Sequence, residues 1–257
     1  MAISLLNAGP TTEVLTPNDL TDYATIEYVD NLVNYAAITV SMSMSNAVPS
    51  LLDGESYTVR EKGQKIESVT LTYNFSKTPA AGTTLLTGYE GVIGKSGNIT
   101  LDYSASPITW KTSTSGRTWT IEGKEEKVPG KTQAKATKSV SINFYNGVYI
   151  GVASIPSEIN SEFLLDTDKF TKTLTGSRVT SFTKNAGSGQ YIWYALPKSI
   201  GKCSFTYGAN PGGFLLVTFD SNDYFSFTNA SGYSEDYYVY RSDYPALGDT
   251  SITVGKA

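Results

Sequence analysis

Hydrophobic and polar residues alternate along most of the chain after residue 37, and short turn sequences interrupt the alternation. In residues 69–75, Val69, Leu71, Tyr73 and Phe75 fall on one side of an extended chain, with polar residues between them. A period of two is typical of a β-strand with one buried and one solvated face. The same alternation predicts strands at 99–103, 119–121, 140–144, 205–207, 225–227, 237–239 and 252–254.

Turn sequences rich in glycine and asparagine separate these strands, among them Asp53-Gly54, Lys62-Gly63, Asn146-Gly147 and residues 210–213. Such spacing is typical of β-sandwiches built from hairpins and Greek keys. The lysine-rich residues 124–138 contain almost no apolar side chains and predict a boundary near Thr137. We therefore expect an all-β chain with two immunoglobulin-like or Greek-key β-sandwich domains, at residues 37–136 and 137–257, each of ordinary domain size.

Residues 1–36 carry a different pattern and are predicted to form an extended arm and a short α-helix. Residues 11–18 are polar and include Pro17, as in an extended segment. Thr25 can cap a helix whose apolar residues occupy a and d positions of two heptads: Ile26, Val29, Val33 and Ala36. A sustained coiled coil needs about three or four heptads. Two interpretations stay open, a helix packed on its own domain or a seam for self-association.

Composition narrows the possible chemistry. The 257 residues include no histidine and one cysteine, Cys203. These counts exclude a Ser-His or Cys-His nucleophile pair, a histidine-ligated metal and an intramolecular disulfide. Hydrophobic residues at 40% and charged residues at 17% are typical of a chain that folds. The formal net charge of −4 argues against a nucleic-acid partner.

The sequence also argues against membrane insertion. Its longest apolar runs, residues 35–40 and 214–217, are far shorter than the ~20 residues that a spanning helix needs. The first eight residues lack the basic and apolar regions of a secretory signal, so we expect a protein that is used without Sec export.

Two clusters of acidic residues are candidates for chemistry. Glu122, Glu125 and Glu126 lie among lysines, with nothing apolar nearby in the sequence to raise a carboxylate pKa, so we interpret them as a solvated strand end. Residues 220–223 offer three oxygen ligands for calcium but lack the central glycine and distal glutamate of an EF-hand loop. We interpret them as a β-turn. The sequence therefore predicts no catalytic residue, no cofactor and no metal site.

Aromatic residues are the remaining candidates for recognition. Two segments place aromatic side chains on both faces of a predicted strand, at Tyr191, Trp193, Tyr194, Tyr237, Tyr238 and Tyr240. One face must be core. The other is predicted to be either core as well or an exposed platform for a glycan or a subunit interface, where Tyr and Trp are favoured.

Several segments resemble bacteriophage virion proteins. Residues 22–30, DYATIEYVD, are similar to the "ATKEYVD" segment near the amino terminus of many tail-fibre and other fibre-like virion proteins. The segments FYNGVYIG at 144–151, YIWYALP at 191–197 and YYVYRS at 237–242 occur in an order that resembles the carboxyl-terminal region of structural virion proteins of tailed phages. The phages with such proteins notably include those that infect gut Bacteroides, among them the crAss-like group.

The resemblance implies a non-enzymatic subunit of a tail, head or collar fibre, located in the virion. Such proteins are usually homotrimers whose β-sandwich domains follow an amino-terminal attachment segment. The expected partners are therefore further copies of the chain, other virion proteins bound through residues 1–36, and a host-surface glycan. The chain shows no long shaft and no extended heptad run, which favours a short appendage or one subunit of a larger assembly.

Two other classes of function compete with this expectation. A carbohydrate-binding module or bacterial adhesin would use the same sandwich pattern and the aromatic residues. A glycan hydrolase needs only two suitably spaced carboxylates and so does not require histidine. No carboxylate lies in an apolar cluster at a strand end in this sequence, so we expect no enzymatic activity.

Overall fold

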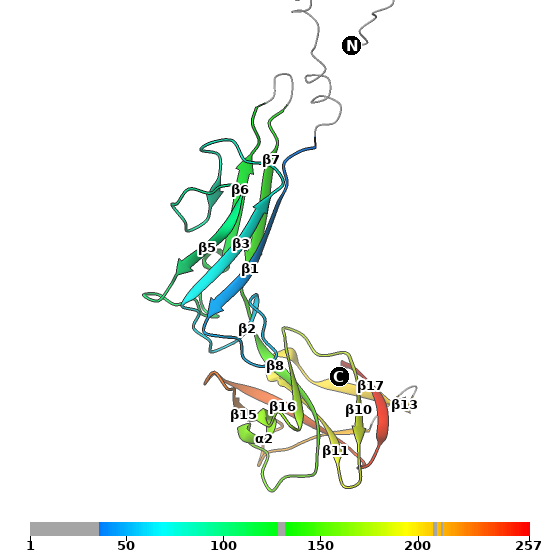
Figure 1. Ribbon diagram of the computed structural model, residues 1–257. Coiled ribbons are helices and arrows are strands. Elements are labelled where there is room, and N and C mark those ends of the chain that lie inside the picture. Colours follow the sequence, from blue (N-terminus) through cyan, green and yellow to red (C-terminus); the bar gives the residue numbers. More distant parts are fainter. Residues whose placement is uncertain (1–35, 128–131, 208–209, 212) are drawn as a thin grey trace, which may run out of the picture.

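The computed structural model describes residues 36–127, 132–207, 210–211 and 213–257. This part of the chain is all-β, as predicted, with little helix. Buried residues form three hydrophobic clusters: one of them defines a first lobe, and the other two lie on opposite faces of one sheet in a second lobe. Figure 1 shows the two lobes arranged end to end along the longest direction of the molecule.

The first lobe contains two three-stranded sheets, β1-β3-β5 and β4-β6-β7, both antiparallel. Their strands are β1 (Val40–Val48), β3 (Ser68–Phe75), β4 (Leu85–Leu86), β5 (Ser96–Asp102), β6 (Thr118–Lys124) and β7 (Lys135–Ser141), with a short 3-10 helix η1 at Thr114–Gly116. One hydrophobic core receives side chains from both sheets. Trp119 of β6 is buried in it and donates its indole N–H to the Tyr103 hydroxyl at 2.7 Å.

The predicted alternation is confirmed in this lobe. All four apolar residues of 69–75 are buried, whereas Asn74 between them is exposed. The polar face is ordered by hydrogen bonds between hydroxyl groups of neighbouring strands, such as the 2.9 Å contact of Thr70 with Thr100. A threonine-rich outer face therefore stays in water and still adds cross-strand contacts.

The chain passes from one core to the other along almost uninterrupted strand. β7 ends at Ser141, and β8 (Asn143–Ala153) begins after Ile142. Thr137, near which the boundary is predicted, lies within β7 opposite Glu122, whereas the core changes further along, between Phe144 and Val148. The short strand β2 (Val59–Glu61) lies between β1 and β3 in sequence but pairs in parallel with the start of β8.

The second lobe is built on a seven-stranded sheet in the order β14-β16-β11-β8-β2, with β15 added on β16 and β9 on β8. Its strands beyond β2 and β8 are β9 (Phe170–Thr175), β11 (Tyr191–Pro197), β14 (Phe214–Leu216), β15 (Phe225–Thr228) and β16 (Ser234–Ser242). A four-stranded sheet, β10-β17-β12-β13, packs on one face of it. That sheet contains β10 (Ser181–Ala186), β12 (Cys203–Tyr207), β13 (Asn210–Pro211) and β17 (Gly248–Lys256), and a short 3-10 helix η2 lies at Lys198–Ile200.

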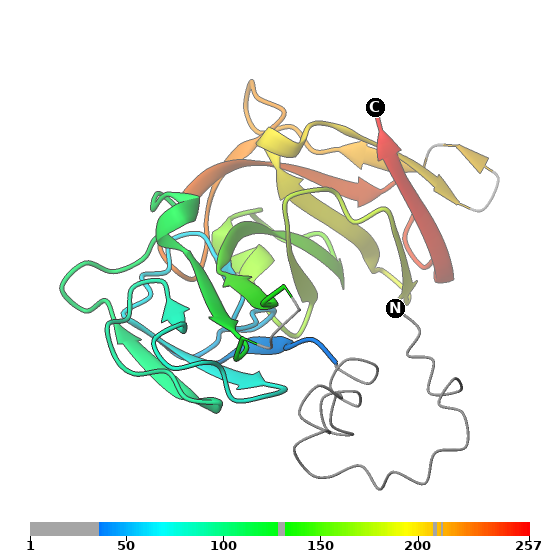
Figure 2. The same ribbon diagram turned by 90° about the horizontal axis from the view of Figure 1, so that it is seen from above.

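The other face of the seven-stranded sheet is covered by the short helix α2 (Ser161–Leu165) and neighbouring loops. The side chain of Asn160 caps this helix by accepting a hydrogen bond from the Phe163 N–H at 3.0 Å. Phe163 then packs edge-on against Trp193 of β11, with ring centroids 5.1 Å apart. The sheet is thus buried on both faces, which is one of the two arrangements expected for its aromatic strands. Figure 2 shows the second lobe from above, with the first lobe beside it.

The predicted amino-terminal seam lies almost entirely outside the described residues. This applies to Ile26, Val29 and Val33, and to the predicted arm and helix as a whole. Ala36, the last residue of the seam, opens the described chain and is exposed.

Candidate functional site

The aromatic residues predicted for recognition are buried within the chain. Five of them, Trp193, Tyr194, Tyr237, Tyr238 and Tyr240, belong to the two cores of the second lobe. The Trp193 side chain is 0% exposed. Its indole N–H donates to the Ala153 carbonyl at 3.0 Å. Tyr191 is half-buried under the Arg241 guanidinium, which lies 4.7 Å from its ring centroid.

Of the two interpretations of these strands, the one in which both faces are core is confirmed, and the exposed platform is not found. The second face is covered by α2 and the adjoining loops. The buried hydroxyls are satisfied internally: Tyr237 donates to the Gly147 carbonyl at 2.8 Å, and Tyr240 accepts from the Cys203 N–H at 2.9 Å. These tyrosines are core residues with hydrogen-bonded ends.

The acidic residues of the β6–β7 hairpin have distinct environments. Glu122 pairs with Lys135 at 2.5 Å, and Glu126 is exposed. Glu125, in contrast, is only 4% exposed, so the prediction that all three are solvated is wrong for this residue. Its carboxylate accepts the Ile38 N–H at 3.2 Å and the Ala134 N–H at 3.1 Å. Glu125 thereby attaches the beginning of the described chain to the β6–β7 hairpin.

Residues 220–223 form a turn. Phe219 and Asn222 exchange backbone hydrogen bonds of 2.7 Å, and Asp220 adopts a φ of 49° between them. The Asp223 carboxylate is paired with Lys202 at 2.5 Å. Within the described part of the chain, no group of three or more acidic, cysteine or histidine side chains is placed to hold a metal ion.

A buried ion pair that the sequence analysis does not identify lies where the lobes meet. Glu61, at the end of β2, has a fully buried side chain, and Lys172 of β9 is 8% exposed. The Lys172 Nζ lies 3.2 Å from Glu61 Oε1, and two hydroxyls also face the carboxylate, those of Tyr149 at 3.4 Å from Oε1 and of Ser231 at 3.4 Å from Oε2. Glu61 thus connects three segments of the second lobe.

Burial controls the protonation of this cluster. It raises the pKa of the Glu61 carboxyl above its usual value, and the positive charge of Lys172 opposes that rise. Burial also raises the pKa of the Tyr149 hydroxyl, and the nearby negative charges of Glu61 and Asp53 raise it further. Tyr149 therefore remains a neutral hydrogen-bond donor under ordinary conditions.

A second layer of charges holds the loop before β2 in place. The buried Glu55 carboxylate accepts the backbone N–H groups of Glu61 and Leu52, each at 2.8 Å, and lies 3.5 Å from the Arg60 Nε. Arg60, also fully buried, donates from Nη2 to the Pro49 carbonyl at 2.6 Å. These contacts fix residues 49–55 against the second lobe.

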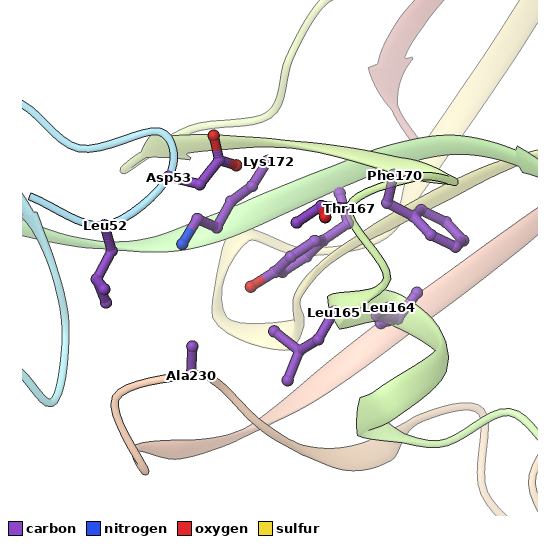
Figure 3. Close-up of a pocket in the computed structure, with 9 residues that line it drawn as sticks. Leu52, Asp53, Leu164, Leu165, Thr167, Phe170, Lys172 and Ala230 are labelled. Carbon is purple, nitrogen blue, oxygen red and sulfur yellow. The ribbon is translucent and has the colours of Figure 1, made fainter.

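This loop forms one side of a cavity of about 240 Å³. Figure 3 shows Leu52 and Asp53 on one side, Leu164 and Leu165 of α2 on another, and Lys172 reaching between them. The cavity is lined by Leu52, Asp53, Tyr149, Leu164, Leu165, Thr167, Phe170, Lys172 and Ala230. It therefore combines a largely apolar wall with one cation (Lys172), one carboxylate (Asp53) and two hydroxyl-bearing residues (Tyr149 and Thr167).

One feature of the sequence could have indicated this site. In β9, Lys172 lies two residues from both Phe170 and Leu174. The three side chains therefore share one face of the strand, which places a lysine on the buried side. Its partner gives no comparable signal, because β2 is three residues long and Glu61 is 111 residues from Lys172 in the sequence. The pairing of β2 with β8 is what brings the two charges together.

Comparison with known proteins gives no match to a family description, a curated protein or a solved structure. Among the residues that the structure describes, no helix has the length and apolar character needed to cross a membrane.

Proposed function

We propose that this protein is a non-enzymatic structural subunit of a bacteriophage virion appendage, of the tail, head or collar fibre type. In this proposal residues 1–36 attach the chain to other virion proteins and bring three copies together. The two lobes then project from the particle and contact the host surface. The resemblance of residues 22–30 and of the later segments to phage virion proteins motivates the proposal.

One structural observation carries it. The described chain begins at the end of the first lobe that is remote from the second lobe (Figure 1). Glu125 holds that beginning in place by accepting the Ile38 N–H. In the proposed appendage, residues 1–36 attach the chain at this end, and the second lobe, which contains the cavity beside Lys172, lies at the other end (Figure 1).

The finer description of the fold belongs to the same proposal. We infer that each lobe is a β-sandwich domain of immunoglobulin-like or Greek-key type, preceded by the arm and helix of residues 1–36. Two antiparallel sheets around one core support this for the first lobe. In the second lobe, the packing of the four-stranded sheet on the seven-stranded sheet supports it.

Light scattering on the purified chain tests the assembly role. The full chain is expected to have the mass of a trimer, and a chain lacking residues 1–36 is expected to lose that mass. Val29→Asp with Val33→Asp should have the same effect, because charge at a and d positions opposes helix association. Asn31→Asp with Asn34→Asp is the matched control and should leave the trimer intact. The proposal is contradicted if the full chain is a monomer and has the same oligomeric state as the chain lacking residues 1–36.

A carbohydrate-binding module or adhesin is the second candidate, and the cavity beside Lys172 favours it. The two functions differ in where the protein is found. Antibody labelling of purified particles should mark an appendage, whereas a free binding module or adhesin would leave the particles unlabelled.

A further inference from the structure

The cavity beside Lys172 is suited to a small ligand. Its volume, about 240 Å³, is below the roughly 300–1,000 Å³ typical of sites for drug-sized molecules. Its walls come from four separate segments: the loop before β2, Tyr149 of β8, the α2 region leading into β9, and the turn at Ala230. Two of these walls are held by interactions already described, since Glu55 fixes the loop and Asn160 caps the helix. The cavity is thus formed by the fold itself.

The apolar part of the wall requires a ligand with one hydrophobic side. Leu164 and Phe170 are buried, and Leu165 is half-buried at the cavity surface. A fully hydrated polar molecule would gain nothing by covering these side chains. A molecule with carbon-bound hydrogens on one side would remove apolar surface from water.

The polar groups require a ligand that both donates and accepts hydrogen bonds. The Lys172 ammonium has three hydrogens, and its contact with Glu61 is one hydrogen bond. Asp53, exposed at the rim, can only accept, and Thr167 can do either. Donor and acceptor groups at the rim match a molecule that carries several hydroxyls.

The charges argue for a neutral ligand. Lys172 is already compensated by Glu61, and Asp53 adds a negative charge at the opening. An anionic ligand would meet both carboxylates, and a cationic ligand would meet the ammonium. The buried Glu61 also acts as a positioning residue, because its contact limits where the flexible lysine side chain can place its nitrogen.

We propose that this cavity binds one neutral pyranose residue of a glycan. The apolar side of the sugar ring packs on Leu164 and Leu165, a ring hydroxyl accepts from Lys172, and another donates to Asp53. This inference rests on the proposed function, because it names the host-surface group that the projecting lobe contacts. The proposed glycan site is thus this cavity, and not the aromatic residues of β11 and β16, which are buried in the cores of the second lobe.

Titration of the purified chain with methyl pyranosides, followed by saturation-transfer and chemical-shift NMR, tests the inference. The panel contains neutral hexose, deoxyhexose and N-acetylhexosamine glycosides, a uronate glycoside, and cyclohexanol as an apolar molecule without the hydroxyl pattern. At least one neutral pyranoside is expected to bind in the millimolar range, more tightly than the uronate and the cyclohexanol. Binding of none of the neutral sugars, or stronger binding of the uronate or cyclohexanol, overturns the proposal.

Two variants locate the binding. Leu165→Trp fills the cavity without changing charge and is expected to weaken binding at least about tenfold. Asp53→Ala removes the acceptor from an exposed rim position and should also weaken binding, which provides a test if the tryptophan variant does not fold. Val92→Trp, at a site 98% exposed in the first lobe, is the control and should bind as the wild type does. Unchanged affinity in Asp53→Ala, or in folded Leu165→Trp, overturns the assignment.

The outcome is separable from that of the proposed function. A chain that forms trimers and labels particles but binds no neutral pyranoside contradicts only the cavity assignment. A chain that binds the sugar but remains monomeric and absent from particles contradicts the virion role and leaves the cavity assignment supported.

Discussion

Glu61 and Lys172 form a buried ion pair, with Oε1 and Nζ 3.2 Å apart, although 111 residues separate them in the sequence. Each comes from a short strand that pairs with β8. A buried pair seldom adds net stability, because both charges lose their hydration. Removing one partner alone is strongly destabilising, because the other charge is then left buried without compensation.

We therefore expect Lys172→Met to lower the free energy of unfolding by about 3–5 kcal/mol. The double variant Glu61→Gln/Lys172→Met should lose less than Lys172→Met alone, because no charge is left uncompensated. Urea denaturation of the two variants and of Glu61→Gln gives the coupling between the residues. Lys169→Met is the matched control: its pair with Asp166 lies at the surface, and the loss should be below about 1 kcal/mol. Equal losses for Lys172→Met and Lys169→Met would contradict the prediction.

The pKa of Glu61 gives a dependence of stability on pH. Burial raises this pKa in the folded state, so between the usual carboxyl pKa and the raised value the folded chain binds more protons than the unfolded chain. The contribution of Glu61 to stability is therefore greatest below the unfolded pKa and is lost as pH rises through the folded pKa. Relative to Glu61→Gln, the wild type should gain stability as pH is lowered from neutrality.

Denaturation of wild type and Glu61→Gln across that range measures the effect, with the difference between the two chains as the readout. Other carboxyls titrate in both proteins and cancel in the difference. A difference that is constant with pH, or that moves in favour of the glutamine variant as pH falls, would show that the Glu61 pKa is not raised.

Tyr240 should have a corresponding effect in alkaline solution. Burial raises the pKa of its hydroxyl to about 12. Its stabilising contribution is present below the unfolded pKa of about 10 and is lost as pH rises from there toward the folded value. The melting temperature of the wild type should therefore fall relative to that of Tyr240→Phe above pH ~10. Parallel melting curves for the two proteins through this range would contradict the expectation.

Gly63 tests the close contact between the lobes. It follows β2 with a φ of +102°, and a Cβ there would lie 2.9 Å from both Ser231 and Tyr233 atoms. Gly82 has a φ of +71° with nothing within 4 Å of the same position. Gly82→Ala should therefore cost only the backbone strain, about 1 kcal/mol. Gly63→Ala adds a steric clash and should cost more than about 2 kcal/mol in thermal or urea unfolding. Similar losses for both variants would show that the contact is easily relaxed.

The all-β class and many strand positions could be predicted from the sequence because burial on a single face leaves a period of two. The strand at residues 68–75 is the clearest case, with Val69, Leu71, Tyr73 and Phe75 inward. Covalent geometry and the hydrophobic effect are sufficient for such a prediction, since no distant partner has to be known.

Both-face burial is harder to recognise from a local pattern. Residues 191–197 read as an almost continuous apolar run, which is typical of a strand covered on both sides. The aromatic residues in the run make an exposed platform equally consistent with the sequence. The choice depends on whether α2 covers the second face, and that helix has only five residues.

The candidate site could not be predicted because its parts are brought together by tertiary contacts. Neither Glu61 nor Asp53 lies in a strand with a clear period, and the cavity wall combines loops from both sides of β8. The burial of Glu125 could not be predicted for the same reason, because it depends on tertiary contacts with the backbone N–H groups of Ile38 and Ala134.

The pairing of β2 with β8 also constrains the order of events during synthesis. β2 leaves the ribosome well before its partner, because β3 to β7 are made between them. Residues 59–61 therefore have no β8 to pair with while the strands of the first lobe are being made. The Glu61 carboxylate likewise has no ion-pair partner until Lys172 has been made. The junction between the lobes can therefore form only after the strands of the first lobe have been made, and a nascent chain stalled before β8 would leave β2 without its partner strand.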